Sequence, residues 1–272
     1  MNKTILITGT STGIGRATAI LFSKKGWNVI ASMLDHQKET ELTTLENVLV
    51  TEMDITKPKT IESTIKKGIE KFGRIDALVN NAAYGQYGLF EAATPDQIEN
   101  QFRVNVFGTM NVTRAILPHF RNNKQGTIIN ISSAGGRIGI PLISLYNSSK
   151  FALEGFSESL SYELSSQNIT LKLVEPGGVA TPFHEVAKDN YAFDSKLTDY
   201  NEYTSAFAKK FETMHHGIAS AEEVAETTFL ATTDDSDQFR YIVGNDAKGW
   251  IKDRTSMDDL TFIRHMREIF KV

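Results

Sequence analysis

The stretch "TILITGTSTGIG", from Thr4 to Gly15, decides the fold of this 272-residue chain. It begins as a short apolar, β-branched run, which predicts a buried strand. The run ends in three glycines that lead directly into a helical pattern: Gly9, Gly13 and Gly15. Glycines permit a tight turn and a close backbone approach to a pyrophosphate, while a helix amino terminus adds unpaired N–H groups. The spacing Gly-x3-Gly-x-Gly differs from the commonest dinucleotide fingerprint, so by itself it indicates only a candidate phosphate loop.

Similar apolar runs recur along the chain and predict an α/β fold. Strands are expected at Thr4–Thr8, Asn28–Ser32, Asn47–Met53, Asp76–Asn80, Gly126–Ser132, Ile169–Pro176 and Arg240–Gly244. Helices are expected at Ile14–Lys25, Pro58–Phe72, Pro95–Asn122, Leu145–Ser166 and Ala221–Thr232. Most strands are continuously apolar, as in strands buried on both faces of a parallel sheet. The β-then-α repetition predicts a doubly wound parallel sheet with helices on both faces, in a single domain over residues 1–272.

Composition narrows the class of protein. The net charge of −4, from 29 basic and 33 acidic residues, does not mark a nucleic-acid binder. Cysteine is absent, which excludes thiolate metal sites and disulfides. No segment reaches the ~18 apolar residues needed to cross a bilayer. We expect a cytoplasmic protein with no membrane or nucleic-acid partner, and no metal site, since His215 and His216 are merely adjacent.

The segment 183–217 breaks the β–α rhythm directly after the sixth predicted strand. It contains Phe183, Tyr191, Phe193, Tyr200, Tyr203, Phe207 and Phe211. Such sheets bind ligands at the carboxyl ends of their strands, where this segment begins. Two interpretations stay open: a helical insertion that packs a small core of its own, and a cover over the substrate.

Six motifs occur in a fixed order: "TGTSTGIG", "NNAA" (Asn80–Ala83), "VNVFG" with Asn105, "ISS" ending at Ser133, "YNSSK" (Tyr146–Lys150) and "PGGVAT" (Pro176–Thr181). In this combination the chain resembles the classical short-chain dehydrogenases/reductases from Lys3 to about Thr181, with a weaker echo in "YIVGNDA". The resemblance implies a Rossmann-type sheet with strand order 3-2-1-4-5-6-7. It also implies a nicotinamide cofactor, a small-molecule alcohol or carbonyl substrate, and a homodimer or homotetramer.

The same resemblance assigns catalytic roles to Asn105, Ser133, Tyr146 and Lys150. Tyr146 would be the general acid/base, with Lys150 near its phenol and on the nicotinamide ribose. Residues four apart share a helix face, although an isolated pair of this kind is more often simple packing. A cation ~4 Å from a phenolate, at an effective dielectric of ~20, is worth about 4 kcal/mol or roughly 3 pKa units. We therefore expect a Tyr146 pKa lowered towards neutrality.

The two remaining members have rivals within the sequence. Ser133 would stabilise the substrate oxygen. Its neighbour Ser132 points to the other face of the strand by alternation, and is the less favoured candidate. Asn105 would bend its helix and hold a water of a proton relay, or simply cap a kink.

Further cofactor contacts follow from the resemblance. Asp54 and Ile55 would bracket the adenine, and Asn80, Asn81 and Ala82 would line the end of the fourth strand. Ala83 stands where the family more often has glycine. The complete expected set is Gly9, Ser11, Thr12, Gly13, Ile14, Gly15, Met33, Leu34, Asp54, Ile55, Asn80, Asn81, Ala82, Tyr146, Lys150, Pro176, Gly177, Val179 and Thr181.

The choice between NAD and NADP depends on the end of the second strand. Met33 stands where NAD-preferring relatives carry an acid that holds the ribose 2′-OH. Leu34 stands where NADP-preferring relatives often carry an arginine. Asp35 follows one residue later and is a weaker candidate for the ribose contact. Because the repelling carboxylate is missing, we expect NADP, with NAD as the alternative.

The sequence thus predicts an NAD(P)-dependent oxidoreductase that interconverts an alcohol and a carbonyl. The aromatic residues after Phe183 suggest a bulky apolar substrate of steroid, retinoid or acyl type. The alternative from another class is a catalytically inactive dinucleotide sensor on the same fold. An epimerase or dehydratase would need a longer substrate domain than this chain offers.

Overall fold

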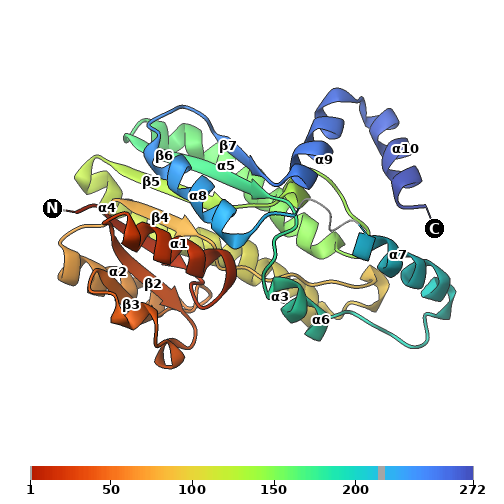
Figure 1. The fold of residues 1–272 in the computed structure, drawn as a ribbon, viewed down its shortest axis with the longest axis horizontal. Helices are drawn as coiled ribbons and strands as arrows, with labels where there is room; N and C mark the ends of the chain where they lie inside the picture. The colour runs from red at the N-terminus through yellow and green to blue at the C-terminus, as the bar shows by residue number, and fades with distance from the viewer. Residues whose placement is uncertain (1, 214–217, 272) are drawn as a thin grey trace.

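The computed structural model describes residues 2–213 and 218–271, and its strands and helices alternate along most of the chain (Figure 1). The strands are β1 (Thr4–Thr8), β2 (Asn28–Met33), β3 (Val48–Glu52), β4 (Ala77–Asn80), β5 (Gly126–Ile131), β6 (Ile169–Pro176) and β7 (Arg240–Val243). The α-helices are α1 (Gly13–Lys24), α2 (Pro58–Phe72), α3 (Pro95–Phe102), α4 (Thr109–Asn123), α5 (Ser144–Ser165), α6 (Phe183–Asp189), α7 (Asn201–Thr213), α8 (Ala221–Thr233), α9 (Asn245–Ser256) and α10 (Asp259–Ile269).

In the described part of the chain the strands form one seven-stranded sheet, and the order β3-β2-β1-β4-β5-β6-β7 confirms the prediction. Every neighbouring pair is parallel. The order reverses between β1 and β4, so the loops that follow these two strands diverge and leave a crevice at the carboxyl edge.

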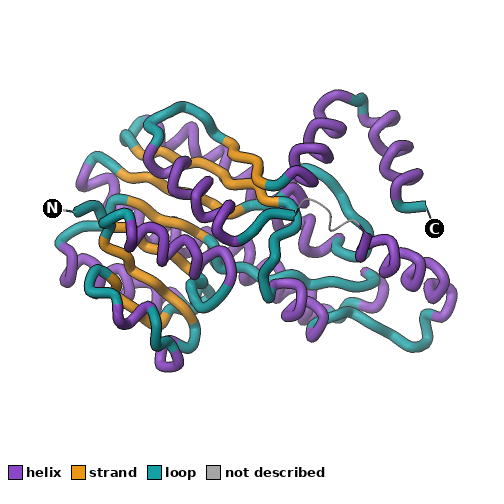
Figure 2. Tube along the Cα trace, viewed as in Figure 1, coloured by secondary structure: helices purple, strands orange, loops and turns teal. Residues whose placement is uncertain are grey.

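Helices cover both faces of the sheet, as Figure 2 shows for the strands in orange between helices in purple. Alternation along β1 sends Ile5 and Ile7 into the core beneath α1 and α8, and Leu6 into the core beneath α2 and α4. All three side chains are completely buried. Burial on both faces explains why the strands are continuously apolar.

The helix predicted over Pro95–Asn122 is wrong as a single α-helix. It consists of α3, a π-helix η4 (Arg103–Gly108), and α4. Single-turn π segments widen a helix locally and often occur at functional sites. Asn105 lies in the middle of η4, so the predicted bend at this residue takes the form of a π segment.

The helices α6 and α7 lie in the segment 183–217, for which a helical insertion is one of the two interpretations, whereas the sequence did not predict α9 and α10. All four helices lie at the end of the sheet where the strands finish (Figure 1). Phe207 of α7 packs with Phe262, Met266 and Phe270 of the C-terminal region in a separate small core. The interpretation of residues 183–217 as a segment with its own core is therefore right for α7. His215 and His216 lie outside the described residues. Within the described ranges, we find no helix long and apolar enough to span a membrane.

Candidate active site

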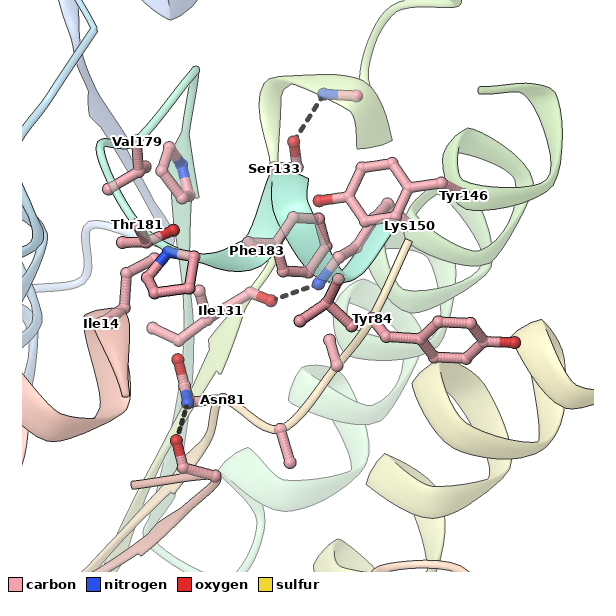
Figure 3. A pocket seen from close by; sticks show the side chains of 18 of the residues that line it. Ile14, Asn81, Tyr84, Ile131, Ser133, Tyr146, Lys150, Val179, Thr181 and Phe183 are labelled. Atoms are coloured by element: carbon pink, nitrogen blue, oxygen red, sulfur yellow. Dashed lines mark hydrogen bonds between the residues drawn. The ribbon is translucent and has the colours of Figure 1, made fainter. Parts of the chain in front are cut away.

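A cavity of about 690 Å³ opens at the carboxyl edge of the sheet, where the turns after β1 to β6 converge. Figure 3 shows Tyr146, Ser133 and Lys150 on one side of it, and Ile14 and Thr181 on the other. The expected residues that line the cavity are Gly9, Ser11, Thr12, Gly13, Ile14, Met33, Leu34, Asp54, Ile55, Asn81, Ala82, Ser133, Tyr146, Lys150, Pro176, Gly177, Val179 and Thr181. Gly15, Asn80 and Asn105 are not among the lining residues.

The glycine loop forms a cradle at one end of the cavity. Gly9 and Gly13 have φ angles of +72° and +56°, a left-handed conformation that favours glycine. A Cβ on Gly15 would lie 2.2 Å from the carbonyl oxygen of Gly9, so the close contact between the loop and α1 requires glycine at this position. Thr12 precedes α1 without a capping side-chain hydrogen bond. The first N–H groups of α1 therefore face the cavity as anion donors.

Asn81 fixes the same loop from the neighbouring strand. Its Nδ2 donates to the carbonyl oxygens of Thr8 (2.9 Å) and Gly9 (3.0 Å). Asn80, one residue earlier, faces the protein interior, where its Nδ2 donates to Thr113 Oγ1 and Asn130 Oδ1. The predicted cofactor role of Asn80 thus has no counterpart in the lining of the cavity, because strand alternation turns the side chain into the core.

Tyr146 and Lys150 occupy the same face of α5, beside the end of β5. Lys150 is 4% exposed, and its Nζ donates to the carbonyl oxygen of Ile131 at 2.8 Å. The Nζ lies 5.8 Å from the centroid of the Tyr146 ring. Ser133 Oγ accepts from the N–H of Gly135 (3.0 Å) and faces the Tyr146 phenol, whose pKa it lowers (Figure 3). Ser133, rather than Ser132, therefore meets Tyr146.

The predicted lowering of the Tyr146 pKa is wrong for this structure. Burial raises the pKa of the phenol to about 12, against a lowering by the Ser133 hydroxyl. Burial also lowers the pKa of Lys150 to about 8, although the nearby Glu154 carboxylate favours the ammonium. Desolvation disfavours both charged forms, and this effect outweighs their mutual attraction. At neutral pH the phenol keeps its proton and the lysine is mostly charged.

Asn105 acts on the cavity through the backbone of Tyr84. Its Oδ1 accepts from the N–H of Tyr84 (3.0 Å), and its Nδ2 donates to the carbonyl oxygen of Tyr84 (2.8 Å) and to Ser149 Oγ (3.1 Å). Asn105 is 2% exposed. It thus ties the loop after β4 to the helix that carries Tyr146 and Lys150.

The opposite end of the cavity carries charges that the sequence interpretation did not weigh. Leu34 is 70% exposed, and Asp35 pairs with Lys38 at 2.6 Å. Arg16, on the first turn of α1, pairs with Glu39 (2.6 Å) and Glu41 (2.5 Å). Arg16 directly follows the glycine loop on α1, and the turn after β2 supplies its partners Glu39 and Glu41 as well as Lys38.

Sequence motifs also missed much of the apolar lining. Tyr84 and Tyr87 come from the loop after β4, and Ile140, Ile143, Ile218 and Trp250 come from scattered loops and α9. The Tyr146 ring packs edge-on between Tyr87 (6.3 Å between centroids) and Phe183 (5.7 Å). The phenol of Tyr84 accepts from Asn100 and points away from the cavity (Figure 3). In the sequence, the two tyrosines of "AAYGQYG" are a signal from which part of this apolar lining could have been predicted.

Comparison with known proteins agrees with this geometry. The family model described as short chain dehydrogenase matches residues 3–192. An uncharacterized oxidoreductase of Schizosaccharomyces pombe is 40% identical over 232 residues, which cover 84% of this chain and 94% of the relative. The 3-ketodihydrosphingosine reductase of Bacteroides thetaiotaomicron is 38% identical over 209 residues, or 76% of this chain and 74% of the relative.

A solved structure, ElxO with NADP bound, superposes with a TM-score of 0.74 at 27% identity, over 89% of this chain and 96% of that chain. Ordered motifs, strand order and site geometry agree with the match of the family model. The chain is an oxidoreductase that belongs to the short-chain dehydrogenase family.

Proposed function

We propose that this protein interconverts an alcohol and a carbonyl with a nicotinamide cofactor, and that Tyr146 is its general acid/base. The observation that carries the proposal is that the Ser133 hydroxyl and the Tyr146 phenol face each other beside Lys150, in the same cavity as the glycine cradle (Figure 3). A proton donor and an oxyanion-stabilising hydroxyl are thereby directed at one point.

The cavity fits a dinucleotide. The cradle of Gly9, Gly13 and the first turn of α1 suits a pyrophosphate, since a side chain at Gly15 would collide with the loop. Asp54 and Ile55 line the end beside β3, and Val179 and Thr181 line the end beside Ser133. When bound there, the nicotinamide accepts or supplies the hydride of the reaction.

For the cofactor we propose NADP(H), with NAD(H) as the alternative. Met33 and Leu34 offer no carboxylate to a ribose 2′-OH. Asp35 is engaged with Lys38 at 2.6 Å, so the nearest acid is partly neutralised by a cation. A site that has a cation nearby and no unpaired carboxylate suits a 2′-phosphate better than a 2′-hydroxyl.

Three side chains divide the work at the reacting oxygen. Tyr146 holds the proton, because burial raises the pKa of its phenol to about 12. Ser133 donates a hydrogen bond to the developing oxyanion. Lys150, fixed through Ile131, supplies positive charge beside the phenol. A protonated Tyr146 is ready to donate, so this arrangement favours carbonyl reduction at neutral pH.

We further propose a bulky apolar substrate. Tyr87, Phe183, Ile140 and Ile143 surround the Tyr146 end of the cavity, and part of the segment 183–217 covers it through Phe183 and Phe211. The similarity to a 3-ketodihydrosphingosine reductase supports a carbonyl on a long aliphatic chain.

A homo-oligomer, dimer or tetramer, remains our proposal for the assembly. Phe107 of η4 is 57% exposed and Phe151 of α5 is 46% exposed, and these two elements pack together. Exposed aromatic side chains on adjoining elements are typical of protein–protein contacts. Light scattering coupled to size-exclusion chromatography tests this proposal, which a monomer at micromolar concentration would exclude. We also propose a cytoplasmic location, consistent with the absence of cysteine from the sequence.

The central experiment is a panel of ketones and aldehydes of increasing chain length, assayed for oxidation of NADPH and of NADH. We expect turnover with long-chain or polycyclic carbonyls, faster with NADPH. An inactive dinucleotide sensor would bind the cofactor and oxidise it with none of these carbonyls, so binding and turnover are measured on the same preparation.

A further inference from the structure

Asp246 lies outside the six motifs that carry the family resemblance between Lys3 and Thr181. It nevertheless contacts the last of them, Pro176–Thr181, directly. It is the second residue of α9, and its Oδ2 accepts from the N–H of Gly178 at 2.7 Å. It also lines the cavity, together with Gly177 and Gly178. A carboxylate from the C-terminal region thus holds the loop after β6.

The steric fit around this contact is close. A Cβ placed on Gly177 would lie 2.3 Å from both carboxylate oxygens of Asp246. Real Cβ atoms do not approach that closely, so the hydrogen on Gly177 is the largest substituent this contact admits. The φ of Gly177 is not in the left-handed region, so the glycine is required by this contact rather than by the backbone conformation.

The remaining oxygen makes the arrangement costly. Asp246 Oδ1 is buried, and it has no hydrogen-bond partner among the described residues. A buried carboxylate oxygen without a partner costs free energy, so each such case calls for an explanation. The unpaired oxygen of Asp246 is explained by the function of the loop after β6, which Asp246 holds, rather than by the stability of α9.

Two other N–H groups of the loop are fixed as well. Gly177 donates to the carbonyl oxygen of Val243 (3.0 Å), and Ala180 donates to that of Ala219 (3.0 Å). The side chain of Asp246 is the one contact in this set that does not come from backbone. Removing the Asp246 side chain therefore frees the N–H of Gly178 in the middle of the loop, while the backbone hydrogen bonds of Gly177 and Ala180 on either side persist.

We propose that Asp246 is a positioning residue for the nicotinamide-binding end of the cavity, and that it acts by clamping Gly177 and Gly178. The inference rests on the proposed cofactor function, because the loop Pro176–Thr181 contributes Val179 and Thr181 to the end of the cavity beside Ser133, where the nicotinamide would bind. Asp246 touches neither the reacting atoms nor the pyrophosphate cradle, so its effect is confined to one half of the cofactor.

The test compares two ligands that differ only in the nicotinamide: NADPH and 2′-phospho-ADP-ribose, with NADH and ADP-ribose as the second matched pair. Dissociation constants are measured by calorimetry for the wild-type protein, Asp246→Ala and Asp246→Asn. Asp246→Ala should bind NADPH at least tenfold more weakly and the truncated ligand within twofold of wild type. Asp246→Asn keeps an oxygen that accepts from Gly178, so its NADPH affinity should stay within threefold.

Gly177→Ala disturbs the same contact from the loop side and keeps the proposal falsifiable if Asp246→Ala does not fold. It should weaken NADPH at least tenfold, and adding Asp246→Ala to it should weaken NADPH no further. Equal losses for NADPH and the truncated ligand, or unchanged NADPH affinity in both single variants, would overturn the positioning role. Failure of the wild-type protein to bind either matched pair would instead overturn the proposed cofactor function together with this inference.

Discussion

The Nζ of Lys150 lies 5.8 Å from the centroid of the Tyr146 ring, with the two residues one helical turn apart on α5. The ammonium group is not free to move, because it donates to the carbonyl oxygen of Ile131 on β5. The sheet therefore fixes the position of the lysine beside the phenol. The spacing of four residues between Tyr146 and Lys150 matters here because it places the ammonium group beside the phenol. Simple packing would accept many other side chains at these positions.

Tyr146→Phe should lower turnover by several orders of magnitude and leave cofactor binding largely intact. The substitution removes the transferable proton and keeps the ring between Tyr87 and Phe183. Steady-state kinetics and cofactor titration measure the two effects separately. Tyr162→Phe is the matched control, since Tyr162 lies on the same helix and is 70% exposed. A Tyr146→Phe variant with a tenth of wild-type activity would exclude Tyr146 as the acid/base.

The pH profile of carbonyl reduction should report the ionisation of Lys150. Because burial lowers the pKa of Lys150 to about 8, its positive charge is present below that pH and lost above it. We expect kcat/KM for reduction to be level near pH 7 and to fall above about pH 8. Lys150→Arg keeps its charge to higher pH and should lack this descending limb, whatever its absolute rate. A limb at the same pH in Lys150→Arg would assign it to another group.

Leu34→Arg should strengthen NADP(H) binding by roughly 1–3 kcal/mol, through a charge-assisted contact with the 2′-phosphate. NAD(H) affinity should hardly change, since NAD(H) has no 2′-phosphate for the arginine to contact. Leu34 is 70% exposed, so the longer side chain meets no steric obstacle in the core. Leu260→Arg, at a similarly exposed position on α10, controls for the added charge. A wild-type preference for NAD(H) of tenfold or more would instead make Asp35 the ribose ligand.

The strands and the glycine loop followed from local patterns in the sequence, whereas the strand order and most of the lining residues followed from the resemblance to the family. A buried parallel strand is recognisable from a continuous apolar run such as Thr4–Thr8, and a glycine cradle from the spacing that follows it. Tyr146 and Lys150 are close in sequence, so helix periodicity alone places them on one face.

What the sequence did not predict depends on distant contacts. The pKa of Tyr146 is set by burial among residues from separate loops, which no local pattern shows. Asn105 meets Tyr84, 21 residues away, and Arg16 meets Glu39, 23 residues away. Helix α9 has only a weak apolar periodicity of its own, and α10 packs Phe262 and Met266 against Phe207 of α7, which is distant in sequence.

Outside the active site, the pair of Lys172 and Asp234 offers a test of the fold itself. Lys172 lies on β6, between β5 and β7, with its side chain 4% exposed, and its Nζ donates to Asp234 Oδ1 at 2.6 Å. Tyr241 donates to the other carboxylate oxygen at 2.5 Å. Burial raises the pKa of Asp234, but the hydrogen bonds from Lys172 and Tyr241 outweigh this effect and hold it well below the usual range.

Asp234→Asn should therefore destabilise the protein by about 3 kcal/mol at pH 7, the lower end for a buried charge left without its partner. An acid with a depressed folded-state pKa stabilises the protein above its unfolded pKa of about 4, and this contribution is lost as the pH falls further. The difference in the free energy of unfolding between wild type and variant, measured by urea unfolding, should be constant from pH 8 to 5 and become smaller below pH 4. Asp235→Asn is the matched control, since Asp235 is exposed and its φ of +49° is one that asparagine tolerates. A difference under 1 kcal/mol at pH 7, or one that widens in acid, would show that the strand accommodates Lys172 without its carboxylate.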